Sequence, residues 1–133
     1  MTTTTTTWPD ANELPFAYLT TSGRRTGRDH TIEIWFAATA TGVYLISGAG
    51  ERADWVRNLH NAPIASVRIG DTTVAAQAQV PVPDGDERSA AVRMLHAKYA
   101  DQVSSTVDAW HRDAYIVALY PHINPDTKQG ENQ

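Results

Sequence analysis

Three arginines around one turn are the most distinctive chemical feature of the sequence. Residues 19–28 read LTTSGRRTGR, so Gly23 and Gly27 bracket Arg24 and Arg25, and Arg28 follows directly. Glycine at both ends allows the turn to reach positive φ, and successive backbone N–H groups in such a turn form a concavity that binds anions. Guanidinium groups add charge and a planar fork that matches phosphate or carboxylate. The pattern favours an anion site over the alternative, an ordinary solvated hairpin loop.

A second glycine-containing segment begins at Ser47. Residues 47–59 read SGAGERADWVRNL, with Gly48 and Gly50 after an apolar strand and before a helix. This spacing is superficially that of a dinucleotide-binding turn, with Asp71 at about the distance of the ribose-binding acid. However, the following helix is too short, and the remaining strands read as hairpins. We therefore expect a glycine turn beside a ligand, at a helix N-terminus. A plain strand-to-helix connection is the alternative.

Composition excludes several classes of function. The chain has 133 residues, enough for one domain, and a net charge of −4. General nucleic-acid or membrane-surface binding needs a basic excess and is not expected. The absence of Cys excludes disulfides and thiolate chemistry. The five His residues lack metal-ligand spacing, so no metal site is predicted. His30 follows the arginine loop and could add a switchable positive charge.

The composition of both ends differs from that of the middle. Residues 2–7 are all Thr, and the C-terminal segment is polar. We expect a disordered tail over residues 1–7, one cofactor-binding domain over 8–122 and a flexible tail over 123–133. No apolar run approaches the length of a membrane span and no signal-peptide pattern follows Met1, so a cytoplasmic protein is expected.

Hydrophobic alternation predicts strands for most of the domain. Segments 30–37 and 43–47 read as one hairpin, and 64–69 and 72–80 as another, joined by the two-residue turn Gly70-Asp71. A last strand covers 114–120. A helical period predicts a short helix capped by Asp54 and a longer one over 86–102. Five or six hairpin-linked strands with two flanking helices indicate a small, mostly antiparallel barrel, mainly β with minor α.

The two glycine segments resemble the signatures of a known family. Leu19 to Gly27 matches the loop Leu-Thr-Thr-x-Gly-Arg-Lys/Arg-[ST]-Gly of the deazaflavin-dependent nitroreductase family, whose members use coenzyme F420 on a split β-barrel. Ser47, Gly50, Trp55, Asn58 and Leu59 match its second signature. The likeness spans roughly residues 14 to 121. It implies the FMN-binding split-barrel type of fold and a reduced deazaflavin as cofactor.

The resemblance also implies roles for individual residues. F420 carries a phosphate and an oligoglutamate tail, which the basic loop would hold, while strand and turn residues would line the deazaflavin ring. The implied cofactor-binding residues are Arg24, Arg25, Thr26, Arg28, His30, Ile34, Trp35, Ser47, Gly48, Ala49, Gly50, Trp55 and Asn58. Tyr99 and Trp110 would face the substrate, and Tyr99, Ser47 or water would supply a proton. Many relatives carry Lys where Gly48 stands and a basic residue where His30 stands.

The implied activity is hydride transfer from the reduced deazaflavin to an electron-poor small molecule such as a quinone, enone or nitro compound. Three alternatives remain open on the sequence alone. They are an FMN-binding split-barrel reductase, a non-catalytic deazaflavin carrier, and an interaction module whose arginine loop docks an acidic partner. Small split barrels commonly pair, so the resemblance also favours a homodimer.

Overall fold

One antiparallel sheet of seven strands organises the protein. The computed structural model describes residues 11–121, so the predicted tails over residues 1–7 and 123–133 lie outside the described part. The strand order is β2-β1-β5-β6-β7-β4-β3, and every neighbouring pair is antiparallel. The strands are β1 (Ala17–Ser22), β2 (Asp29–Ile34), β3 (Phe36–Ala38), β4 (Val43–Ser47), β5 (Ile64–Ile69), β6 (Thr72–Gln79) and β7 (Tyr115–Pro121).

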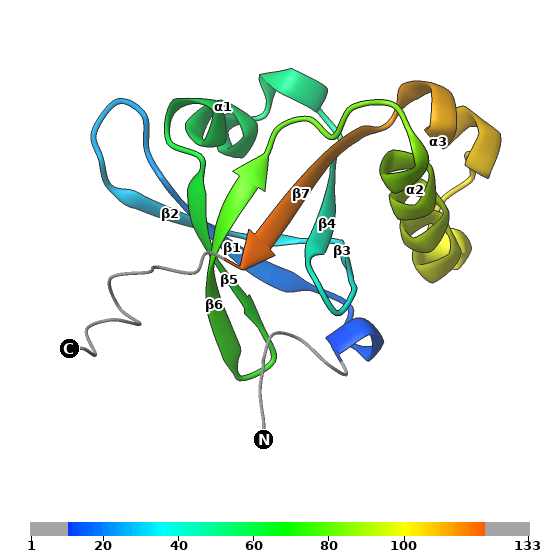
Figure 1. The fold of residues 1–133 in the computed structure, drawn as a ribbon, viewed down its shortest axis with the longest axis horizontal. Helices are drawn as coiled ribbons and strands as arrows, with labels where there is room; N and C mark the ends of the chain where they lie inside the picture. The colour runs from blue at the N-terminus through cyan, green and yellow to red at the C-terminus, as the bar shows by residue number, and fades with distance from the viewer. Residues whose placement is uncertain (1–10, 122–133) are drawn as a thin grey trace.

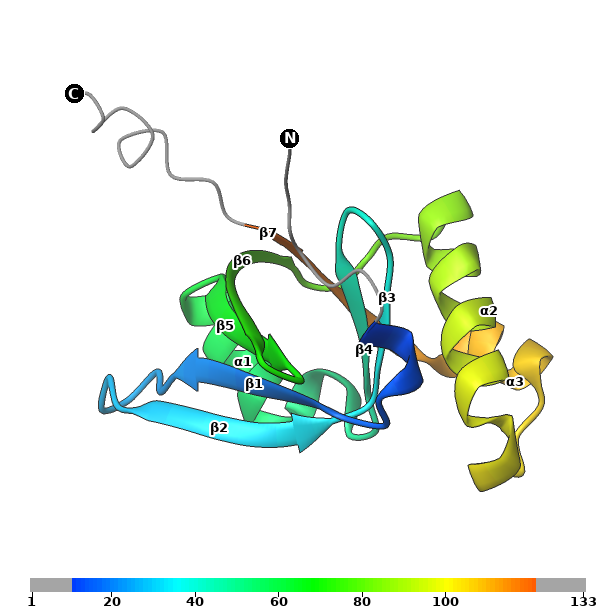
Figure 2. The same ribbon diagram turned by 90° about the horizontal axis from the view of Figure 1, so that it is seen from below.

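The sheet curls because its two end strands are consecutive in the chain. β2 and β3 stand at opposite ends of the strand order, yet only Trp35 separates them. A single residue cannot span a flat seven-stranded sheet, since strands lie about 4.8 Å apart. The sheet must therefore bend round on itself, as Figures 1 and 2 show. The predicted split-barrel architecture is confirmed.

The break at Trp35 corrects the predicted first hairpin. Residues 36–38 do pair with β4, but Asp29–Ile34 pairs with β1, with Ile34 opposite Ala17 and Asp29 opposite Ser22. The sheet accordingly has seven strands, one more than the upper expectation. Local alternation marks a strand correctly but contains no information about which distant segment it pairs with. The second hairpin is confirmed: Ile69 faces Thr72 across the turn, where Gly70 has φ +62°.

The concave face of the sheet holds the main core. Leu19, Phe36, Val43, Leu45 and Val67 are fully buried there. The helix α1 (Asp54–Asn61) contributes Val56 and Leu59, which are also fully buried. Replacing such a leucine by alanine typically costs about 2–5 kcal/mol of stability. This core rigidly fixes the strands that carry the site.

A second, smaller core lies between the sheet and α2 (Asp86–Tyr99). Ala91, Val92, Leu95 and Tyr99 of α2 form this cluster with Ala37, Tyr44, Ile116 and Ala118 of the sheet. The predicted longer helix is confirmed, and its buried residues recur with a helical period. The helix continues as a 3-10 turn over Ala100–Gln102, which accounts for its expected end near residue 102.

Two details of the helices differ from the predictions. Ala53, not Asp54, is the N-cap of α1, and it makes no side-chain capping bond. Asp54 is instead the first helical residue and pairs with Arg24 at 3.3 Å. A third helix, α3 (Val107–Asp113), was not predicted; its N-cap is Thr106, whose hydroxyl accepts a hydrogen bond from the Ala109 N–H. Figure 1 shows α2 and α3 together beyond one side of the sheet.

Candidate functional site

The arginine loop, residues 23–28 between β1 and β2, borders a cavity of about 450 Å³. We call it the arginine-loop cavity. Its lining comes from the loop, the two strands and α1, and comprises Thr21, Gly23, Arg24, Arg25, Thr26, Arg28, His30, Ile32, Asp54, Trp55 and Asn58. Seven of the predicted cofactor-binding residues therefore lie together: Arg24, Arg25, Thr26, Arg28, His30, Trp55 and Asn58.

Arg24 fastens this loop to α1. Its backbone N–H and its Nη1 both donate to Oδ1 of Asn58, at 3.1 and 2.9 Å. Asn58 is buried, and its Nδ2 donates to the hydroxyl of Thr21 at 3.1 Å. Asp54 accepts from Nη2 of Arg24. These contacts satisfy the buried amide and hold Arg24 in place, so its role includes positioning the loop.

The other two arginines of the loop keep their charge available. Arg25 and Arg28 are exposed, and their guanidiniums form no hydrogen bond or ion pair with any residue in the described range. Thr26 braces the turn, because its hydroxyl accepts from the Arg28 N–H at 3.2 Å. Gly27 has φ +77°, as expected of a glycine turn. Two unpaired guanidiniums beside a cavity constitute an anion-binding donor set.

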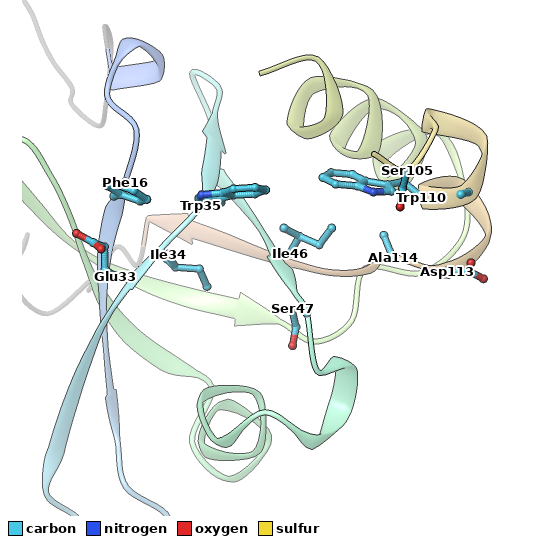
Figure 3. A pocket seen from close by; sticks show the side chains of 12 residues that line it. Phe16, Glu33, Ile34, Trp35, Ile46, Ser47, Ser105, Trp110, Asp113 and Ala114 are labelled. Atoms are coloured by element: carbon cyan, nitrogen blue, oxygen red, sulfur yellow. The ribbon is translucent and has the colours of Figure 1, made fainter. Parts of the chain in front are cut away.

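A second cavity, of about 560 Å³, lies beside the break between β2 and β3. We call it the indole cavity, since Trp35 and Trp110 both line it. Its residues come from β2, β4 and the α3 region, and comprise Phe16, Glu33, Ile34, Trp35, Ile46, Ser47, Gly48, Ser105, Ala109, Trp110, Asp113 and Ala114. Figure 3 shows these side chains around the hollow.

Both indoles are held by neighbouring rings. Trp35 stacks on Tyr99, with ring centroids 4.2 Å apart and planes 3° from parallel. Trp110 meets the ring of His96 edge-on, with centroids 5.0 Å apart. Such contacts fix aromatic side chains in preferred arrangements. The cavity consequently presents rigid apolar surfaces suited to a flat ring.

Tyr99 does not reach this cavity. Its side chain is buried, and its hydroxyl accepts from the Phe36 N–H at 3.0 Å and lies 2.8 Å from the carbonyl oxygen of Pro15. Burial raises the pKa of the hydroxyl, partly opposed by the Phe36 backbone. The expectation that Tyr99 faces the substrate is thus corrected, and we do not propose it as a proton donor. Trp110, the other residue expected to face the substrate, does line the cavity.

The turn after β4 forms one border of the indole cavity. Ser47 is buried, and its hydroxyl donates to the Gly50 carbonyl at 2.8 Å, which leaves oxygen lone pairs as acceptors. Gly48 is exposed, and a Cβ placed there would meet no atom within 4 Å. Gly50 has φ +63°, and neither Gly50 nor Ala49 lines either cavity. Among the four predicted turn residues, only Ser47 and Gly48 border the hollow.

The α3 region supplies residues that sequence reasoning missed. The residues of this region that line the indole cavity without having been predicted are Ser105, Ala109, Asp113 and Ala114. Three further lining residues outside this region were also missed: Phe16, Glu33 and Ile46. Arg88 of α2 anchors this wall, because its guanidinium donates to the carbonyls of His111 and Ala114, each at 2.7 Å. Neither the short, weakly apolar α3 nor Arg88 carries a local signal for such a role.

The two cavities follow one another along β2. Ile32 lines the arginine-loop cavity and Ile34 the indole cavity. Residues two apart on a strand face the same side and lie about 6.6 Å apart. The two cavities are thus neighbours along β2, the first with free guanidiniums and the second with flat apolar surfaces. The guanidiniums fit the phosphate and acidic tail of the cofactor that the family resemblance implies, and the apolar surfaces fit its planar ring.

Comparisons with known proteins agree with this geometry. Residues 2–110 match the profile of the family described as F420H2-dependent quinone reductase. A search of curated proteins returned no match. In the described range, no helix is both long and apolar enough to cross a bilayer.

Solved structures share the fold at low sequence identity. HutZ, described as the heme storage protein from Vibrio cholerae, has a TM-score of 0.67 at 15% identity, covering 87% of this chain and 88% of its own. A structure described as an F420 reductase has a TM-score of 0.63 at 18% identity, with coverages of 90% and 97%. One described as an F420-H2 dependent reductase has a TM-score of 0.62 at 18% identity, with coverages of 80% and 93%.

Proposed function

Because the chain belongs to the F420H2-dependent quinone reductase family and is an F420H2-dependent oxidoreductase, we propose that it holds the cofactor across both cavities and reduces a quinone-type acceptor in the indole cavity. Enones and nitro compounds are further acceptors in this proposal. The supporting observation is the succession of the two cavities along β2, one with free cations and one with flat apolar sides. The family assignment supports F420 over FMN as the cofactor.

Each part of the site has its own task in this proposal. Arg25 and Arg28 bind the anionic tail, and Arg24 positions their loop through Asn58 and Asp54. Ile34, Trp35 and the turn at Ser47 and Gly48 orient the ring, while the indoles exclude water from it. When bound, the reduced cofactor supplies a hydride, which with one proton converts a quinone to its hydroquinone.

The source of that proton is proposed from the geometry of Ser47. Its hydroxyl hydrogen is directed at the Gly50 carbonyl, so the side chain can accept a hydrogen bond from a ligand while its own proton remains engaged. We therefore propose Ser47 as an orienting residue and water as the proton donor.

Charge removal at the two free arginines tests the proposal. The double variant Arg25→Ala/Arg28→Ala should weaken binding of F420 by about 1.5–3 kcal/mol for each lost charged contact. Stability should be nearly unchanged, because neither guanidinium forms a hydrogen bond or ion pair with another described residue. The measurement is a titration of deazaflavin fluorescence at low and high salt. Arg93→Ala, which removes an exposed charge from α2, is the matched control.

Two results would contradict the proposal. One is an unchanged dissociation constant in the double variant. The other is equal binding of F420 and of a deazaflavin lacking phosphate and glutamates. Absence of turnover with a panel of quinones, despite tight cofactor binding, would instead favour a carrier.

We further propose that the protein is a cytoplasmic homodimer. β2 pairs only with β1 in the described part of the chain, so its other edge offers unpaired backbone groups to a second copy. Light scattering coupled to size-exclusion chromatography tests the oligomeric state, and cell fractionation tests the location. A monomer across the micromolar range would overturn the first proposal.

A further inference from the structure

The indole cavity carries two carboxylates and no basic side chain. Glu33 on β2 and Asp113 at the end of α3 line it, and its lining includes no Lys, Arg or His. Figure 3 shows Glu33 and Asp113 at opposite ends of the hollow, with Trp35 and Trp110 between them. The Tyr18 hydroxyl donates to Glu33 at 3.0 Å, and the Arg68 guanidinium lies over the Tyr18 ring, 4.4 Å from its centroid.

Basic groups that contact the lining do not offset these charges. Arg88 directs its hydrogen bonds to the carbonyls of His111 and Ala114, and it lies 3.8 Å from Asp84. It thereby compensates the partial negative charge at the C-terminus of α3. Nε2 of His96 lies 2.7 Å from the carbonyl oxygen of Ser105. The carboxylates of Glu33 and Asp113 form no ion pair within the described residues.

The two cavities therefore have opposite electrostatic character. The arginine-loop cavity has three guanidiniums and His30 against the single carboxylate of Asp54. The indole cavity has carboxylates alone. A negatively charged ligand is attracted to the first and repelled from the second.

We propose that the indole cavity selects its acceptor by charge: it takes flat aromatic acceptors that are neutral or cationic and rejects those that carry a carboxylate, sulfonate or phosphate group. The inference rests on the proposed function, which places the acceptor in this cavity. The preference for flat acceptors follows from the two indoles, because a partner ring holds each of them in place. Charge discrimination follows from Glu33 and Asp113.

The expected size of the effect follows from their exposure. Both carboxylates are exposed to solvent, so each should disfavour a nearby monoanion by about fivefold at low salt. Salt should narrow this preference, because exposed charges are screened over about 10 Å at 0.1 M ionic strength. The affinity for a neutral acceptor should depend little on salt.

The test compares naphthoquinone with naphthoquinone sulfonate in the wild type and in Glu33→Gln/Asp113→Asn. Equilibrium dialysis measures binding of each compound to the protein with and without oxidised F420, and steady-state kinetics measures kcat/KM. The intrinsic reactivity of each compound cancels in the variant-to-wild-type ratio. Relative to naphthoquinone, the double variant should improve sulfonate binding and kcat/KM about fivefold at low salt, because the two carboxylates lie at opposite ends of the cavity and one sulfonate can approach only one of them. Asp71→Asn, in the turn after β5, is the control for loss of a carboxylate outside the cavity, and it should change the binding of neither compound.

Two outcomes would overturn the inference. One is an unchanged sulfonate-to-quinone ratio in the double variant, and the other is wild-type protein that binds both compounds equally, or neither. Because dialysis does not require turnover, failure of the proposed reductase activity is distinguishable: binding would still discriminate by charge while reduction would be absent. A circular dichroism melt of each variant establishes that the fold is intact.

Discussion

At the scale of single residues, Gly48 leaves open space where a longer side chain could stand. It borders the indole cavity, and a Cβ there would meet no atom within 4 Å. Gly48→Lys should therefore fold normally and add one cation near the cofactor. We expect F420 to bind more tightly, by up to about 1.5–3 kcal/mol if the ammonium reaches a phosphate. Fluorescence titration measures this, with Gly48→Gln as the neutral control. Equal affinities for the two variants would show that no anion lies within reach.

The hydroxyl of Tyr99 stabilises the fold through its hydrogen bonds to the backbone. It links the Phe36 N–H to the Pro15 carbonyl inside the protein. Tyr99→Phe keeps the ring on which Trp35 stacks but leaves those backbone groups unpaired. We expect a loss of about 1–3 kcal/mol in unfolding free energy and little change in kcat. Urea denaturation and steady-state kinetics measure both, with Tyr115→Phe as a control. A large fall in kcat without loss of stability would restore Tyr99 as a catalytic candidate.

At the scale of elements, the position of α3 depends on Arg88 of α2. The guanidinium binds two carbonyls at the C-terminal end of α3, so it fixes the wall that carries Trp110 and Asp113. Arg88→Met should loosen this wall and raise the KM for the acceptor several-fold. The dissociation constant of F420 should change less than this KM, because the proposed site for its anionic tail, the arginine loop, lies across the molecule from α2 (Figure 1). Arg88→Met should also lower the free energy of unfolding by about 2 kcal/mol.

The matched control for Arg88 is Arg112→Met. Arg112 is an exposed residue of α3 whose side chain forms no hydrogen bond or ion pair among the described residues, so both KM and stability should stay near the wild-type values. A rise in KM of equal size in the two variants would mean that charge, and not the position of α3, is responsible.

At the scale of the whole molecule, stability should depend on pH through Lys98. Its Nζ donates to the Phe36 carbonyl at 3.1 Å, and burial lowers its pKa from 10.5 to about 8. Between pH 8 and 10 the unfolded chain therefore holds more protons than the native protein, so stability rises with pH in that window. Above pH 10 the sign reverses, because burial, aided for Tyr44 and Tyr120 by Glu87, raises the pKa values of Tyr44, Tyr99 and Tyr120. For Tyr44 the raised pKa is about 12.

Urea denaturation at a series of pH values measures this profile. The wild type should be most stable at about pH 10. Lys98→Met should abolish the rise below the maximum and keep the fall above it. A wild-type profile that is flat from pH 8 to 10 would contradict the assignment to Lys98.

Much of the architecture could be predicted because its signals are local. Alternation predicted every strand except β1, although it joined β2 and β3 into one segment; Gly70 indicated a hairpin turn, and a helical period predicted α2. The arginine loop could be recognised as a candidate anion site for the same reason, since glycine and arginine lie there within ten residues. Trp55, Asn58 and the loop were expected in one pocket from the resemblance, and they do line one cavity.

The sequence by itself determined most of the segments that form strands, the helices α1 and α2, and which residue types carry charge. Only the tertiary structure decided that the segment predicted as one strand breaks at Trp35 into β2 and β3, which lie at opposite ends of the sheet. It also decided that α3 completes the indole cavity and that the Tyr99 side chain is buried. The physical reason is the distance along the chain over which these contacts act. The bond from the Phe36 N–H to the Tyr99 hydroxyl joins residues 63 positions apart, and no local pattern of side chains specifies such a partner.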